Sequence, residues 1–283
     1  MTNTLVITAF NRPALIRDCL ESCFSLDGID QYKIVMVHQK GNSDVERIIS
    51  DYSHFFSTLI STEPSGRNTD TFITNNRILG LYVGFEFWKS EFVVSVEEDV
   101  ILAPDSLRFI EFAFEKNKSD SNFRGVNLGS KLPLLEVGPF SYSRLRFGMH
   151  GPASMITKET WKKINPQRIM KNSSIIFDAQ VEFALKTGFM ITPNASRYID
   201  QGVVGSHTTD KLDDHYFNGL KGSFVGDLKT SNDYFLENFQ PNWRQDCVVY
   251  KVQDNLKYEA KNKCYWILLK FPKILHFLNR NNR

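Results

Sequence analysis

The sequence predicts an α/β fold in which a mostly parallel sheet is flanked by helices. Over the first hundred residues, short apolar runs rich in β-branched residues alternate with longer runs of helical spacing. This alternation is typical of strand–helix–strand units, which place parallel strands side by side and helices on the faces of the sheet. At 283 residues, with 42% hydrophobic and 23% charged residues, the chain can bury a substantial core.

The N-terminal half predicts four strands, each followed by a helix. Pro13 lies near the start of the first helix, and Ser43 or Asp44 is expected to cap the second. Neither a G-x-G-x-x-G nor a G-x-x-x-x-G-K-[ST] motif is present, which argues against a dinucleotide-binding dehydrogenase and a P-loop enzyme. The expected strands are 5–9, 33–38, 55–61 and 92–96, and the expected helices are 13–25, 44–52, 70–89 and 105–116.

The second half of the sequence is less regular. A loop rich in Pro and Gly covers 131–142, and a loop rich in Gly, Asp and His covers 202–226. Gly188 is a plausible C-cap for the helix before it. Short strands are expected at 125–128, 155–157, 189–192 and 196–199, and helices at 158–164 and 177–187.

Three consecutive carboxylates, Glu97, Glu98 and Asp99, follow the fourth strand. Adjacent acids repel one another and are costly to desolvate, so fold stability gives little reason for them at the end of a core strand. A bound cation would remove the conflict, and ligands of open α/β sheets lie outside the carboxyl ends of the strands. The alternative is that the strand simply reaches solvent here and that Asp105 starts the next helix.

Several motifs resemble those of glycosyltransferases with the GT-A fold. Residues 5–13, LVITAFNRP, are similar to the opening of such enzymes. The acidic cluster with Ala-Pro-Asp at 103–105 resembles the metal-binding signature of the N-acetylglucosaminyltransferase I type. Downstream, and in the family's order, 147–151 resembles its acceptor-side loop, 177–178 its catalytic-base segment and 205–207 its Gly-x-Ser-His motif.

The resemblance covers roughly residues 4 to 208 and implies a division of the chain. A nucleotide-sugar-binding half is expected at 1–117, and an acceptor and catalytic-base half of the same GT-A domain at 118–230. A C-terminal extension with a basic amphipathic tail is expected at 231–283.

The resemblance also implies roles for the acidic cluster. Asp99 would be the metal ligand, Glu98 would contact the ribose or the metal shell, and Glu97 would face the nucleotide or the sugar. Mn²⁺ or Mg²⁺ suits such oxygen ligands and would neutralise the leaving diphosphate. Arg12 stands where the family has a nucleotide-contacting arginine; the alternative is a surface arginine on the first helical turn.

Inverting transfer needs a general base opposite the leaving group. Asp178 is the candidate by resemblance and Glu182 the runner-up, because two residues four apart on a helix share a face. The alternative is that both are solvated helix acids, or that Asp178 is an N-cap. His207, in the segment 205–207 that resembles the family's Gly-x-Ser-His motif, is expected to help a loop close over the diphosphate, or else to be an ordinary hydrogen-bonded loop residue.

Charge and cysteine content limit the partners and the compartment. The net charge of +2 indicates no polyanionic partner, so no nucleic acid is expected. Cys19 and Cys23 share a helix face and are expected to be small core residues rather than metal ligands. No signal peptide or membrane span is evident, which favours the reducing cytoplasm.

The C-terminal tail, 261–283, carries six Lys or Arg residues and no acid, interleaved with aromatic and aliphatic residues. This composition is typical of a segment that lies on an anionic membrane surface, although Pro272 would divide a helix there. A terminal helix packed on the domain is the alternative. We therefore expect a cytoplasmic protein that associates peripherally with the inner face of the membrane.

Taken together, the sequence predicts a metal-dependent, inverting glycosyltransferase of hexosyl or N-acetylhexosaminyl type, active in polysaccharide biosynthesis. Its donor would be a UDP-sugar, with UDP-GlcNAc suggested by resemblance, and its acceptor a glycan or lipid-linked hydroxyl. Gln39-Lys40 stands where the family has an acid that reads uracil, so the base stays open. A metal-dependent nucleotidyltransferase or phosphohydrolase and a non-catalytic sugar- or nucleotide-binding module are the alternatives.

Overall fold

The computed structural model describes residues 2–64, 69–129, 142–145, 152–167, 188–193 and 196–202. Several sequence predictions fall outside these residues and stay predictions. They are the proposed general bases Asp178 and Glu182, the motif residue His207 and the tail 261–283.

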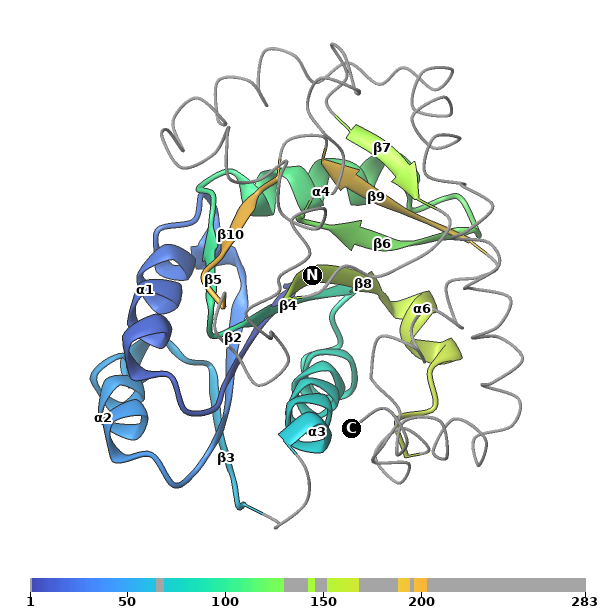
Figure 1. The fold of residues 1–283 in the computed structure, drawn as a ribbon. Coiled ribbons are helices and arrows are strands. Elements are labelled where there is room, and N and C mark those ends of the chain that lie inside the picture. Colours follow the sequence, from blue (N-terminus) through green and yellow to red (C-terminus); the bar gives the residue numbers. More distant parts are fainter. Residues whose placement is uncertain are drawn as a thin grey trace, which may run out of the picture.

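An eight-stranded sheet lies at the centre of the described part, in the order β3-β2-β1-β4-β8-β6-β9-β7 (Figure 1). Strands β7 and β8 run opposite to the other six. The predicted fold class, a mostly parallel sheet flanked by helices, is therefore confirmed. The strands are β1 (Thr4–Ala9), β2 (Lys33–Gln39), β3 (Thr58–Thr62), β4 (Phe92–Glu97), β6 (Phe123–Asn127), β7 (Tyr142–Leu145), β8 (Ala153–Thr157) and β9 (Phe189–Pro193).

The helices of the N-terminal half fall where they are predicted, with small differences at their ends. Asn42, rather than Ser43 or Asp44, caps α2, because its side-chain oxygen accepts the N–H groups of Asp44 and Val45. No described helix is long and apolar enough to cross a membrane. The helices are α1 (Pro13–Phe24), α2 (Ser43–Asp51), α3 (Thr69–Tyr82), the π-helical turn Val83–Phe87, α4 (Ser106–Asn117) and α6 (Lys158–Lys163).

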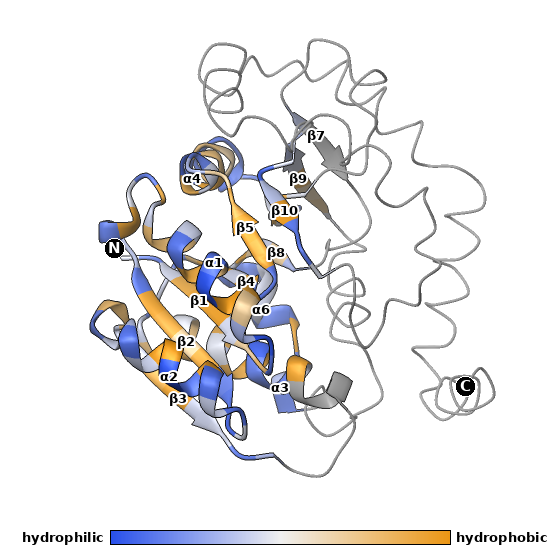
Figure 2. Cartoon of the chain, turned by 60° about the vertical axis from the view of Figure 1, so that its left-hand side comes forward, coloured by the Kyte–Doolittle hydropathy of each residue, from blue (hydrophilic) through white to orange (hydrophobic). Residues whose placement is uncertain are grey.

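Both faces of the sheet are covered by helices, as the continuous apolar strands require (Figure 2). Leu5 and Ile7 of β1 belong to a core cluster with residues of α1, α2 and α4. Val6, which points the other way, packs with residues of α3 and α6. Helix α3 lies so close to the sheet that a Cβ at Gly80 would overlap the Val6 side chain.

A second, two-stranded sheet was only partly predicted. Strand β5 (Val100–Leu102) directly follows the acidic cluster and pairs antiparallel with β10 (Tyr198–Asp200). The sequence predicts a strand near the position of β10 but none at β5, because the three residues of β5 are too few to show the alternation of apolar and polar residues that indicates a strand. This pairing brings a segment from the far end of the described chain beside the cluster.

We expect the buried imidazole of His38 to make stability depend on pH. His38 is 4% exposed and its Nε2 lies 2.7 Å from Ser61 Oγ, while Nδ1 has no hydrogen-bond partner among the described residues. Burial lowers the pKa of His38 below 6.5. The charge of Glu46 raises this pKa, whereas the charge of Lys40 lowers it by a smaller amount. The folded chain thus binds this proton less tightly than the unfolded chain.

The contribution of His38 to stability is therefore present above pH about 6.5 and is lost as the pH falls below that value. The free energy of unfolding, measured by urea titration, should decrease between about pH 7 and pH 5, and less steeply in His38→Gln. Equal slopes in the two proteins would contradict the assignment.

Candidate active site

The acidic cluster lies where two parallel strands end together. β1 and β4 are neighbours, with Thr8 opposite Glu97, so the residues that follow the two strands meet at one edge of the sheet. Strand β4 is buried up to Val96 and becomes partly exposed at Glu97. The predicted position of the cluster, at the carboxyl end of a core strand, is confirmed.

Glu98 faces the turn between β1 and α1. Its side chain is buried, and its Oε2 accepts the backbone N–H of Phe10 at 2.7 Å. The Nε of Arg12 lies 3.7 Å from Oε1. Burial raises the pKa of Glu98, while the Phe10 N–H and the charge of Arg12 act against this rise. In this arrangement Glu98 fixes the turn that carries Arg12.

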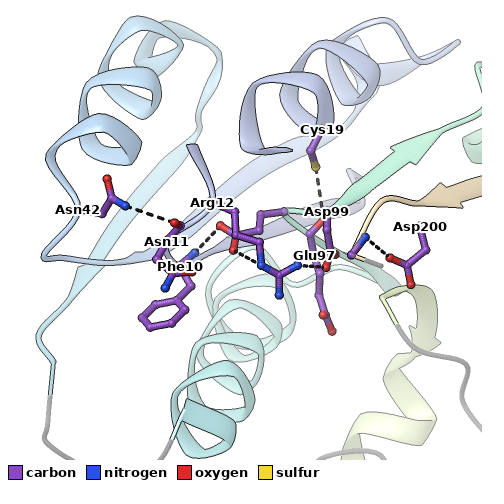
Figure 3. A network of polar contacts seen from close by, with 10 residues as sticks. Phe10, Asn11, Arg12, Cys19, Asn42, Glu97, Asp99 and Asp200 are labelled. Carbon is purple, nitrogen blue, oxygen red and sulfur yellow. Dashed lines mark hydrogen bonds and ion pairs between the residues drawn. The ribbon is translucent and has the colours of Figure 1, made fainter. Parts of the chain in front are cut away.

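The two oxygens of the Asp99 carboxylate differ, because Oδ2 forms an ion pair and Oδ1 has no hydrogen-bond partner among the described residues. Arg12 Nη1 donates to Asp99 Oδ2, so Arg12 points into the cluster and is not a free surface arginine (Figure 3). Asp99 is 8% exposed, and its Oδ1 is buried without a hydrogen-bond partner among the described residues. A buried, unpaired carboxylate oxygen is costly unless a ligand takes it up.

Glu97 is oriented by Arg77 of α3, a residue that the sequence analysis missed. Arg77 is 3% exposed, and its Nη1 lies 3.4 Å from Glu97 Oε1. Its Nε and Nη2 donate to the hydroxyls of Ser95 and Ser154 at 3.1 and 2.8 Å. The signal in the sequence was an arginine four residues before Leu81, where the helical period expects an apolar residue.

The back of Glu97 is held by the first helix. The Cys19 thiol donates to the backbone carbonyl of Glu97 at 3.4 Å (Figure 3). Cys19 and Cys23 are both free thiols in the core, as predicted. Helix α1 therefore contacts the backbone of the acidic cluster through the Cys19 thiol.

Asp200, at the end of β10, is a second acid that the sequence analysis missed. Its Oδ1 accepts the N–H of Gly202 at 2.8 Å, and Gln201 N–H donates to the Asp99 carbonyl at 2.8 Å. Burial raises the pKa of Asp200, and the negative charge of Asp99 raises it further. The only local signal in the sequence was an Asp-x-Gly turn after a short strand. Such a turn does not indicate that Asp200 lies near Asp99.

A buried ion pair anchors the strand that carries Asp200. Arg197 and Asp105 are each about 1% exposed, and Arg197 Nε lies 3.1 Å from Asp105 Oδ2. The Arg197 carbonyl also accepts the Ala103 N–H at 2.9 Å and the Ser106 hydroxyl at 3.0 Å. Asp105 was predicted as the first residue of this helix but lies at its N-cap, just before α4, and its side chain makes no cap hydrogen bond. It pairs with Arg197 instead.

The donor set fits a divalent cation whose coordination is completed by substrate. Four carboxyl groups share this edge of the sheet with two guanidinium groups, those of Arg12 and Arg77. Within the described segments no three His, Cys, Asp or Glu side chains form a ready metal cluster. Mg²⁺ and similar ions are commonly held by one or two carboxylates, with phosphate oxygens and water as the other ligands. The unsatisfied Oδ1 of Asp99 is the oxygen best placed for this role.

Comparison with known proteins gives no family. No family model matches the sequence, and no curated protein matches it. Among solved structures, the mannosyltransferase PcManGT from Pyrobaculum calidifontis, in complex with GDP-Man and Mn²⁺, is 14% identical with a TM-score of 0.41. The match covers 64% of this chain and 52% of that chain, so this chain spans about half of its length.

Two further structures are similar at the same level. TarS 1–349 of S. aureus in complex with UDP is 14% identical, with a TM-score of 0.48, over 70% of this chain and 59% of that one. Mannose-1-phosphate geranyltransferase from Thermus thermophilus is 12% identical, with a TM-score of 0.42, and the match covers 72% of this chain and 76% of that chain. Identities and TM-scores this low assign neither a family nor an activity to the chain.

We expect Arg197→Met to destabilise the protein by about 3 kcal/mol at neutral pH, because it leaves the Asp105 carboxylate buried without its cation. Burial raises the pKa of Asp105 to about 6, and Arg197 acts against that rise. Without Arg197 the pKa should rise further, so at about pH 5 a proton replaces the guanidinium and the loss of stability should be smaller.

Urea unfolding at the two pH values measures both effects. Lys162→Met is the matched control, since its ion pair with Glu159 is exposed and its loss should change stability by less than about 0.5 kcal/mol. Equal losses for the two variants would contradict a stabilising role for the buried pair.

Proposed function

We propose that the protein is a metal-dependent glycosyltransferase of the GT-A type. It transfers a sugar, with inversion, from a nucleotide sugar to a hydroxyl of a glycan or a lipid-linked acceptor. UDP-sugars, and UDP-GlcNAc among them, are the first candidates for the donor. One observation carries the proposal: a buried, half-paired Asp99 carboxylate stands at the carboxyl end of β4, in an acidic motif followed by Ala-Pro-Asp.

Each residue of the cluster then has a task in donor binding. Asp99 would hold Mn²⁺ or Mg²⁺, which when bound would neutralise the leaving diphosphate. Arg12, next to Asp99, offers a planar guanidinium that suits phosphate oxygens. The Glu97 side chain is 30% exposed and forms an ion pair with Arg77, so it can face the ribose or the sugar. Glu98 fixes the turn that presents Arg12.

The reacting groups on the acceptor side are proposed from the resemblance alone. Asp178 would accept the proton of the acceptor hydroxyl as that oxygen attacks the anomeric carbon, with Glu182 as the second candidate. His207 would help a loop close over the diphosphate and exclude water. All three lie outside the described residues.

The donor can be found by thermal unfolding with a panel of UDP-, GDP- and dTDP-sugars, each with Mn²⁺ or with a chelator. A cognate donor at saturating concentration should raise the melting temperature by on the order of 5 °C, and only with Mn²⁺. Asp99→Asn should abolish this rise. The control is Glu115→Gln, which removes an exposed acid of α4 paired with Lys118.

Three results would count against the proposal. A panel without any Mn²⁺-dependent stabilisation would contradict donor binding, and an unchanged response in Asp99→Asn would contradict the metal assignment. Cleavage of the sugar nucleotide at phosphate, with no glycoside formed, would favour a phosphohydrolase.

Asp178→Asn should leave donor affinity unchanged and lower turnover by about 10²- to 10⁴-fold, because a general base acts only in the chemical step. Turnover measured as glycoside formed, together with donor affinity by calorimetry, separates the two effects. Glu182→Gln is the comparison: the larger loss of turnover identifies the base. Full activity in both variants would remove this pair from the mechanism.

A further inference from the structure

Asp200 reaches the acidic cluster from a strand that the chain forms about 100 residues after Asp99. In the β5–β10 ladder, Asp200 lies opposite Val100, the residue directly after Asp99. The Gln201 N–H bond to the Asp99 carbonyl continues this pairing by one step. Backbone pairing therefore holds the chain at Asp200 beside the chain at Asp99.

Both carboxylates lie close to the backbone of Gly202. A Cβ at position 202 would overlap Asp99 Oδ2 and would lie 3.0 Å from Asp200 Oδ1. Both carboxylates thus approach the single point that a side chain would occupy. A residue with a side chain would push these carboxylates away, so glycine at this position allows both of them to lie close to the same stretch of backbone.

The Asp99 carboxylate also carries an unsatisfied oxygen. Asp99 is more than nine-tenths buried, and its Oδ1 has no hydrogen-bond partner among the described residues, although Oδ2 pairs with Arg12. A second acid placed beside an unsatisfied carboxylate adds repulsion, which a cation between them would relieve.

A purely local role does not explain where Asp200 lies. Its bond to the Gly202 N–H is an Asx turn, and such a turn needs no second acid nearby. Asp120 makes the same turn with the N–H of Asn122 in an exposed loop. The turn accounts for an aspartate at position 200 but not for its position beside Asp99.

We infer that Asp200 is, with Asp99, the second carboxylate ligand of the divalent cation in this site. The inference rests on the metal dependence of the proposed function and adds to it a residue outside the Glu-Glu-Asp motif. Two carboxylates, with phosphate oxygens and water, give the oxygen environment that Mn²⁺ and Mg²⁺ prefer. Arg197, buried against Asp105, acts as a positioning residue because it anchors β10.

The test is direct Mn²⁺ binding to the full chain, with Mn²⁺ alone and with Mn²⁺ plus UDP, followed by the loss of the free-ion electron paramagnetic resonance signal. Asp200→Asn keeps an oxygen for the Gly202 N–H but removes the charge, and it should weaken Mn²⁺ binding at least tenfold. Asp120→Asn, which changes the same kind of turn far from the cluster in sequence, should bind Mn²⁺ like the wild type.

The melting temperature without metal provides a second measurement. It should be unchanged or higher in Asp200→Asn, because the change removes repulsion from Asp99. Wild-type Mn²⁺ affinity in Asp200→Asn would overturn the inference and leave the proposed function standing. Absence of Mn²⁺ binding by the wild type, with and without UDP, would overturn both.

Discussion

Five residue pairs join β1 to β4 in parallel register, from Thr4 opposite Val93 to Thr8 opposite Glu97. Because the register is parallel, both strands end at the same edge, and the turn after β1 must meet the acids after β4. Glu98 bonds to that turn through the Phe10 N–H, and Arg12 of the same turn pairs with Asp99. A shift of this register by one residue would turn every side chain of the shifted strand to the other face of the sheet, and it would separate Arg12 from its partner.

Arg12 and Arg77 divide the charge of the cluster between two faces of the sheet. Arg12 precedes α1 on one face, and Arg77 belongs to α3 on the other, so each guanidinium reaches the carboxylates from a different layer. Neither layer can move alone without leaving a carboxylate unpaired in a largely buried setting. Contacts from both layers therefore hold the cluster, and such support favours the precise placement of a ligand.

The sequence predicted the parallel part of the fold and the position of Glu97, Glu98 and Asp99, because these depend on local periodicity and on the order of strands and helices. It did not predict the β5–β10 pair or the proximity of Asp200, since pairing between segments so far apart leaves no mark on either segment alone. Arg77 was missed for a different reason: a buried arginine at an apolar position of a helix is visible locally but its partners are not.

The ion pair between Asp105 and Arg197 also has a consequence for the order of folding. Asp105 and Asp99 leave the ribosome about 100 residues before Arg197 and β10 do. Until β10 has been synthesised and has paired with β5, neither carboxylate is fully buried, and both can stay hydrated without a desolvation penalty. During synthesis, complete burial of these charges therefore has to wait for residues 197–200, which are added after the strands β1 to β4.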